Sequence, residues 1–178
     1  MHIRTADLSD LPAMEQLYEA ARGYMAQEGN ATQWGSIYPL REWLEQDIAE
    51  GISHVCEQDG TVVGTFLFAM GPDPTYAHIE EGQWPDDRPY GVVHRLTTGG
   101  SRRGVGTFCL QWCLRQCERL RIDTHRNNRS MLKLLEKLGF MFCGIIYVED
   151  GTPRLAYQRA GDGPLSGSVG QRAEERGH

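Results

Sequence analysis

Apolar residues along the chain recur with two different periods, and the change of period divides the sequence into helices and strands. Four segments carry apolar residues at helical spacing, and seven shorter segments carry the alternating or continuous apolar residues typical of strands. We predict helices over residues 10–27, 40–50, 105–120 and 128–138. We predict strands over residues 2–6, 53–58, 61–70, 90–98, 121–124, 140–148 and 152–158.

Turn signals connect several of these elements. Asp59-Gly60 and Asp150-Gly151 each stand between two strand-like segments, so each predicts a β-hairpin. Residues 71–89 contain four prolines and several acidic residues, and a loop of this length is usually functional or mobile. From residue 160 the chain is rich in glycine, serine and charge without periodicity. We therefore expect one domain over residues 1–159 and a disordered tail over residues 160–178.

Composition limits the classes of function. The chain has 178 residues, 40% hydrophobic content and a formal net charge of −6. These values suit one globular domain and do not favour nucleic acid as a partner. No apolar run approaches the roughly 20 residues that span a bilayer, and the first residues lack the apolar core of a signal peptide. We therefore expect a cytoplasmic protein without a membrane partner.

Three of the five cysteines recur every four residues in one predicted helix, at Cys109, Cys113 and Cys117. A structural zinc site would need a fourth ligand in a closed tetrahedral arrangement. Apolar residues stand beside these cysteines along the helix. Their pattern favours reduced cysteines that fill a core-facing side, so we expect no metal.

The segment most indicative of ligand binding is residues 90–107, YGVVHRLTTGGSRRGVGT. A predicted strand leads into a basic, glycine-rich loop, and a helix then begins. Free N–H groups at the helix start, the helix dipole and two arginines together favour an anion. The loop is not a Walker A motif, because Val105 stands where the lysine is required. A dinucleotide fingerprint is weak, because Cys109 occupies the third glycine position.

Two blocks resemble the GNAT superfamily of N-acetyltransferases. Residues 101–106, SRRGVG, resemble its acyl-CoA pyrophosphate loop, Gln/Arg-x-x-Gly-x-Gly/Ala, with Ser101 where Gln or Arg is usual. Residues 121–140 resemble its fifth strand and following helix, with Asn128 at the family's Asn position and EKLGF at the close. The resemblance implies an α+β fold, an α/β sandwich. In this fold a mixed, mostly antiparallel sheet of about seven strands is flanked by about four helices.

The resemblance also implies an activity. An acetyl group would pass from acetyl-CoA to a primary amine, on a small molecule or a protein, by direct attack in a ternary complex. A homodimer is compatible with the family. The pyrophosphate would lie on the loop and helix start, and the pantetheine arm would pair with the fourth strand. The cofactor-binding residues implied are Leu96, Thr97, Thr98, Ser101, Arg102, Arg103, Gly104, Val105, Gly106, Thr107, Asn128 and Met131.

A base near neutrality is needed to deprotonate the amine, and two histidines are candidates. His125 follows the fifth strand, where the adjacent Asp123 would raise its pKa and orient it. His94 lies on the fourth strand. Alternatively, His125 could cap the helix entry or contact CoA, and His94 could be an ordinary strand histidine.

Acceptor contacts are expected from loops. In the family, the connection between the first two helices lines the acceptor pocket, which makes Trp34 and Tyr38 candidates. Glu80 and Glu81 in the long loop could hold a cationic amine. In the alternative interpretation, the aromatic rings close the core and the acids are solvated.

One position departs from the family pattern. The usual general acid is a tyrosine seven residues after the Asn, and Leu135 occupies that position. Its absence favours an alternative function, a non-catalytic acyl-CoA-binding or sensing module on the same fold.

Overall fold

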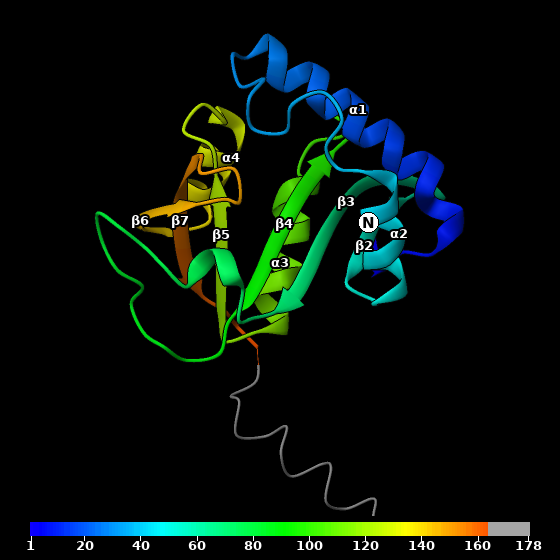
Figure 1. The fold of residues 1–178 in the computed structure, drawn as a ribbon. Helices are drawn as coiled ribbons and strands as arrows, with labels where there is room; N and C mark the ends of the chain where they lie inside the picture. Colours follow the sequence, from blue (N-terminus) through cyan, green and yellow to red (C-terminus); the bar gives the residue numbers. More distant parts are fainter. Residues whose placement is uncertain (164–178) are drawn as a thin grey trace, which may run out of the picture.

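A computed structural model describes residues 1–163, which form a seven-stranded sheet with helices on both faces (Figure 1). The strands are β1 (His2–Thr5), β2 (Ser53–Gln58), β3 (Thr61–Met70), β4 (Gly91–Thr98), β5 (Arg119–Thr124), β6 (Met141–Tyr147) and β7 (Pro153–Ala160). The helices are α1 (Leu11–Gln27), α2 (Arg41–Ala49), α3 (Val105–Gln116) and α4 (Arg129–Lys137). Two short 3-10 turns, η1 (Leu8–Asp10) and η2 (Pro74–Tyr76), precede α1 and interrupt the long loop. The predicted fold class and both hairpins are confirmed.

The sheet order is β1-β2-β3-β4-β5-β7-β6, and every neighbouring pair except β4 and β5 is antiparallel. The parallel contact between β4 and β5 consists of two residue pairs, Gly91 with Leu120 and Val92 with Arg121. Beyond these pairs the two strands diverge, as the gap between them in Figure 1 shows. The sheet is therefore split, towards the carboxyl ends of β4 and β5.

A bulge distorts β4 in its diverging half. Thr65 of β3 pairs with Thr97, whereas Leu67, two residues further along β3, pairs with His94, three residues back along β4. The extra β4 residue accompanies Arg95, whose φ of +55° lies in the left-handed region. Non-glycine residues rarely adopt this conformation, and its occurrence often marks a functional site.

Three hydrophobic clusters form among the described residues, and the smallest joins η2 to β4, β6 and β7. The two larger clusters form cores on opposite faces of the sheet, because β2 and β3 bury apolar side chains on both faces. One core lies under α1 and α2 and includes Met14, Leu44 and Val55. The other lies between the sheet, α3 and α4. The two helix pairs thus cover opposite faces of the sheet.

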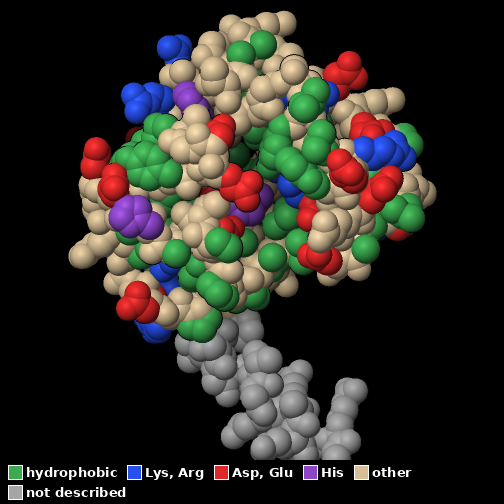
Figure 2. Space-filling view, viewed as in Figure 1, with side chains coloured by type: hydrophobic (Ala, Val, Ile, Leu, Met, Phe, Trp, Pro, Cys, Tyr) green, Lys and Arg blue, Asp and Glu red, His purple; other side chains and the backbone are tan. Residues whose placement is uncertain are grey.

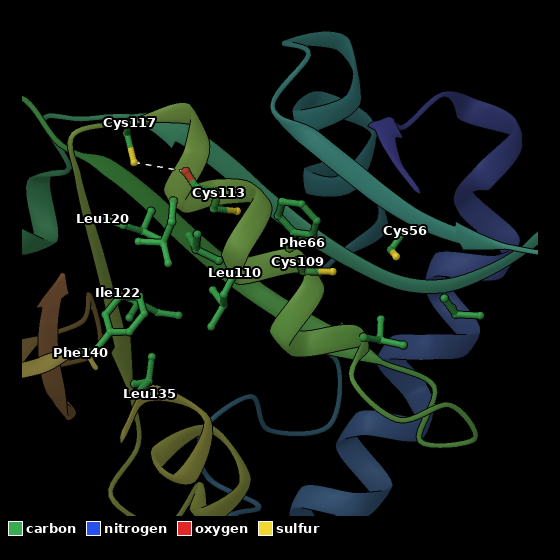
Figure 3. Close-up of a cluster of buried hydrophobic side chains, with 14 residues drawn as sticks. Cys56, Phe66, Cys109, Leu110, Cys113, Cys117, Leu120, Ile122, Leu135 and Phe140 are labelled. Atoms are coloured by element: carbon green, nitrogen blue, oxygen red, sulfur yellow. Dashed lines mark hydrogen bonds between the residues drawn. The ribbon is translucent and has the colours of Figure 1, made fainter. Parts of the chain in front are cut away.

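The second core contains four of the five cysteines, Cys56, Cys109, Cys113 and Cys117 (Figure 3). All five cysteines are free and buried, and the prediction of reduced, core-facing side chains is confirmed for Cys109, Cys113 and Cys117. The prediction that α3 extends to residue 120 is wrong, because the helix ends at Gln116 and Cys117 is extended, with φ −148° and ψ 160°. No glycine or proline marks this end, and apolar residues at 117 and 120 suit a helix and a strand equally well.

The predicted tail also begins too early. Residue 160 belongs to β7, and the N–H groups of Gly161, Asp162 and Gly163 donate to carbonyls at the end of α3 and the start of the next connection. A Cβ on Gly161 would lie 1.9 Å from the Cys117 carbonyl oxygen, so only glycine fits this close approach. The rest of the predicted tail, residues 164–178, lies outside the described residues.

We expect Leu135→Ala to destabilise the protein by about 2–5 kcal/mol, because the Leu135 side chain is fully buried between α4 and the sheet. Denaturant unfolding would measure the change. Leu8→Ala is the matched control, since Leu8 is 62% exposed and its loss should change stability by less than about 0.5 kcal/mol. Equal effects of the two substitutions would contradict this placement of Leu135.

Candidate active site

The divergence of β4 from β5 opens a cleft of about 680 Å³. In the view of Figure 2 this face is hollowed near its centre, where acidic, histidine and basic side chains meet hydrophobic ones. The walls come from β4, β5, α4, the α1–α2 connection, the long loop before β4 and the β6–β7 turn. Lining residues include Gln33, Trp34, Tyr38, Trp43, Asp73, Thr75, His94, Arg95, Leu96, Asp123, Thr124, Asn128, Met131 and Arg154.

The basic glycine loop ends where α3 begins. Gly104 precedes the helix with a φ of +80°, and Phe108 donates to the Gly104 carbonyl at 3.0 Å. The N–H groups of residues 105–107 precede this first intrahelical bond and are free to bind an anion. Arg102 pairs with the exposed carboxylate of Asp59 at 3.1 Å, and Ser101, Arg103 and Gly104 are exposed.

The other predicted cofactor residues lie on the two sides of the split sheet. Leu96 on β4 and Met131 on α4 line the cleft. Thr97 and Thr98 lie in the half of β4 that has left β5, and both still pair with β3. The second edge of this half-strand therefore has backbone groups without a partner in β5.

Asn128 caps α4 and also joins it to the α1–α2 connection. Its Oδ1 accepts a hydrogen bond from the Met131 N–H at 3.2 Å, and its Nδ2 donates to Gln33 Oε1 at 3.3 Å. The Gln33 carbonyl accepts from Arg154 of β7 at 3.1 Å. The α1–α2 connection thus crosses from α1 to the opposite side of the cleft.

His94 lies between two carboxylates. Its Nε2 is 2.6 Å from Asp73 Oδ2, and its Nδ1 is 3.8 Å from Asp123 Oδ1. The buried Tyr76 donates its hydroxyl proton to Asp123 Oδ1 at 2.6 Å. Burial and the Asp123 charge raise the pKa of Tyr76 well above its usual value, so the hydroxyl remains a donor. The long loop, β4 and β5 each contribute to this cluster.

The charges around His94 determine its protonation. Burial alone would raise the pKa of Asp73, but hydrogen bonds from His94 and Thr75 lower it to about 2. Asp73 is then an ionised acceptor, so the proton between it and His94 belongs to Nε2. Burial also opposes the charged form of His94, but the Asp73 hydrogen bond and the Asp123 charge raise its pKa above 6.5. When His94 is neutral, its free lone pair is on Nδ1.

His125 does not join the cluster. Its Nδ1 accepts a hydrogen bond from the Asn127 N–H at 3.1 Å, at the entry to α4. Burial and two nearby arginine charges lower the pKa of His125. The predicted pairing of His125 with Asp123 is therefore wrong. The Asp123 carboxylate is oriented by Tyr76 instead, because the long loop folds over β5.

Aromatic rings form the wall on the side of the α1–α2 connection. Trp34 and Tyr38 both line the cleft, with ring centroids 5.7 Å apart. Tyr38 in turn lies 5.7 Å from the ring of Trp43, which is partly exposed.

Glu80 and Glu81, which we predicted to hold a cationic amine, do not line the cleft. The backbone of Glu80 forms a β-bridge with Ile145 of β6, and its carboxylate accepts from the Tyr147 hydroxyl at 2.9 Å. These bonds fix this part of the loop at the edge of the sheet. The same loop contributes Asp73 and Thr75 to the cleft instead.

Asp73 and Arg95 were not predicted as site residues. Asp73 stands between two prolines, and its Oδ1 accepts from the Thr75 N–H at 2.9 Å as the cap of η2. The sequence Asp-x-Thr signals such a cap, but nothing in it indicates His94 as a partner. Arg95 follows His94, so regular strand alternation places it on the opposite face.

Among residues 1–163, no group of three or more His, Cys, Asp or Glu side chains is arranged to hold a metal ion. Every helix in that part of the chain is too short or too polar to cross a membrane.

Known proteins share this architecture. Residues 12–140 match the acetyltransferase (GNAT) family. A GNAT family acetyltransferase from Streptococcus agalactiae is 31% identical, with a TM-score of 0.82 over 89% of this chain and 94% of that one.

Two more distant structures share the fold. A ribosomal-protein-alanine N-acetyltransferase from Brucella melitensis is 22% identical, with a TM-score of 0.60 over 90% of this chain and 99% of its own. The Salmonella typhimurium protein yncA, solved with acetyl-CoA, is 19% identical, with a TM-score of 0.57 over 89% and 92%. A search of curated proteins gave no significant match. The family match and the similarity to the S. agalactiae enzyme lead to one conclusion: this chain belongs to the GNAT acetyltransferase family.

Proposed function

We propose that this protein transfers an acetyl group from acetyl-CoA to a primary amine by direct attack of the amine in a ternary complex. The observation that carries the proposal is the divergence of β4 from β5, which leaves one edge of β4 unpaired and opens a cleft lined by His94. The same strand continues into the glycine loop and the free helix start of α3. Membership of the GNAT family supports an acetyltransferase, and yncA was solved with acetyl-CoA as its cofactor.

The residues present suit acetyl-CoA as the donor. The free N–H groups of residues 105–107 can bind the pyrophosphate, and Arg103 adds an exposed positive charge. Beyond Val92, the β4 edge facing β5 offers backbone groups to the amides of the pantetheine arm. A backbone N–H along this edge can also polarise the thioester carbonyl.

His94 is suited to deprotonate the acceptor. Asp73 fixes the tautomer in which Nδ1 carries the lone pair, and the raised pKa of His94 makes the imidazole a stronger base. Asp123 lies beside Nδ1 and can attract the ammonium form of the acceptor. Holding donor and acceptor together in the cleft would supply much of the rate.

The leaving thiolate needs no strong acid, because a thiol pKa of about 8.5 makes it a stable anion. Leu135 is buried in the core and has no proton to give. This residue favours the second candidate, an acyl-CoA-binding module without catalysis. Binding of acetyl-CoA without turnover on any amine would identify that second function.

The donor site can be tested through its loop. At 100 times its Kd, acetyl-CoA should stabilise the wild-type protein by about 2.7 kcal/mol in a thermal-shift measurement, and NAD or ATP should not. Ser101→Glu places a carboxylate beside the pyrophosphate site and should remove most of this shift. Ser101→Gln is the uncharged control of equal size and should keep it. A shift with a nucleotide but not with acetyl-CoA would refute the donor assignment.

The base can be tested in an amine-acetylation assay that measures the release of free CoA. His94→Ala should lower kcat/KM by about 10²- to 10⁴-fold on the best amine from a CoA-release screen, because proton transfer loses its acceptor. His125→Ala is the matched histidine control and should retain activity near that of the wild type. The reverse ranking of the two variants would assign the base to His125.

The pH dependence reports on Asp73. In the wild type, kcat/KM should rise with pH through the raised pKa of His94, above 6.5. Asp73→Asn removes the carboxylate that stabilises the imidazolium, so the pKa of His94 falls. The acid limb of the kcat/KM–pH profile should therefore move to lower pH. A limb that stays in place in Asp73→Asn would show that His94 is not the titrating base.

A further inference from the structure

Arg95 occupies an unusual position on β4. Side chains of consecutive strand residues normally face opposite sides of a sheet. Here the bulge and the φ of +55° at Arg95 interrupt that alternation, so that His94 and Arg95 both line the cleft. The backbone is therefore strained at Arg95, the residue that places a positive charge next to the imidazole of His94.

The guanidinium of Arg95 is buried but incompletely bonded. Its side chain is only 10% exposed, and one end pairs with the Asp47 carboxylate of α2. The Tyr38 ring lies 5.9 Å from its central carbon. Its Nε is buried without a hydrogen-bond partner among the described residues. An arginine carries five N–H donors, so the Asp47 pairing at Nη2 and a bond to the Tyr38 side chain still leave capacity for a second anion.

The cleft thus separates its charges. The negative charges of Asp73 and Asp123 lie at the two ring nitrogens of His94. The positive charge of Arg95 lies next to His94, on the side of the cleft that carries the aromatic rings. The Arg95 charge acts to lower the pKa of His94, so the two cations are close enough to interact. A molecule with an ammonium and a carboxylate a few bonds apart matches this arrangement, because each end meets the opposite charge.

We propose that Arg95 binds a carboxylate of the acceptor, and that the acceptor is an amino acid or a similar small amine that carries a carboxylate. This inference rests on the proposed acetyltransferase function. The amine lies at His94, the carboxylate meets the Arg95 guanidinium, and an apolar side chain packs on Trp34 and Trp43. Asp47 is a positioning residue that holds the guanidinium in place when the acceptor is absent.

The test compares L-amino acids with their own amides, using acetyl-CoA and the release of free CoA. The pair L-phenylalanine and L-phenylalaninamide shares the amine and the side chain and differs only in the carboxylate. We expect kcat/KM to favour the acid by on the order of ten- to a hundredfold, which corresponds to one charge-assisted interaction. The amide is less basic and has more free amine at neutral pH, so this chemical bias opposes the expected order.

Variants locate the effect. Arg95→Met should abolish the preference for the acid, and Arg95→Lys should keep only part of it, because lysine lacks the forked donors. Arg41→Met is the control, since Arg41 forms exposed ion pairs with Glu15 and Glu45 away from the cleft. Retention of the acetyl-CoA thermal shift would show that each variant is folded. The comparison of acid and amide in the wild type needs no variant.

The outcomes separate the two proposals. If a panel of such pairs is acetylated without preference for the acids, the assignment of Arg95 is overturned and the acetyltransferase function stands. If the acids are preferred and Arg95→Met keeps the preference, another residue binds the carboxylate and the inference is equally overturned. If acetyl-CoA binds but no acid or amide in the panel is acetylated, while another amine in the CoA-release screen is, only the inference falls. If no amine in the screen is acetylated either, the proposed function falls, and the inference falls with it.

Discussion

The two residue pairs that join β4 to β5 are the constraint on which the site depends. The two halves of the sheet stay together with so few pairs because α3 packs across β3, β4 and β5 and forms a common hydrophobic core with them. The two pairs are too few to satisfy the backbone of the rest of β4. Backbone groups that face a cleft need water or a ligand as a partner. A continuous sheet would have been more stable at this point and would have had no cleft.

The charged side chains around the cleft also contribute more to the geometry of the site than to the stability of the fold. Asp73, Asp123 and Asp47 are partly buried acids, and each is matched by a cation or a hydroxyl from another element. Such pairs contribute little net stability, since desolvation offsets much of their attraction. Their arrangement instead holds a defined tautomer of His94 and a fixed guanidinium next to it. Elements that are distant in sequence meet here because the long loop folds back over β5.

Local patterns were sufficient to predict the elements of the fold. The dipeptides Asp59-Gly60 and Asp150-Gly151 placed both hairpins, and the loop at 101–106 with Asn128 indicated the family. The end of α3 was misplaced because the residues from Cys117 to Leu120 fit a helix and a strand alike. Long-range contacts could not be predicted in the same way. The partner of Asp123 was assigned to His125 from sequence adjacency, whereas it is Tyr76, 47 residues away. Arg95 was not predicted as a cleft residue, because the bulge that turns it into the cleft has no signal in the sequence.

The buried cysteines have a practical effect on the study of this chain. All five lie inside the fold, and burial raises the pKa of each of the three thiols on and beside α3. Reactive thiolate is therefore scarce on the native protein. Free CoA, by contrast, presents an accessible thiol as soon as it is released. A thiol-reactive dye can then follow product formation continuously, with little signal or inactivation arising from the folded protein itself.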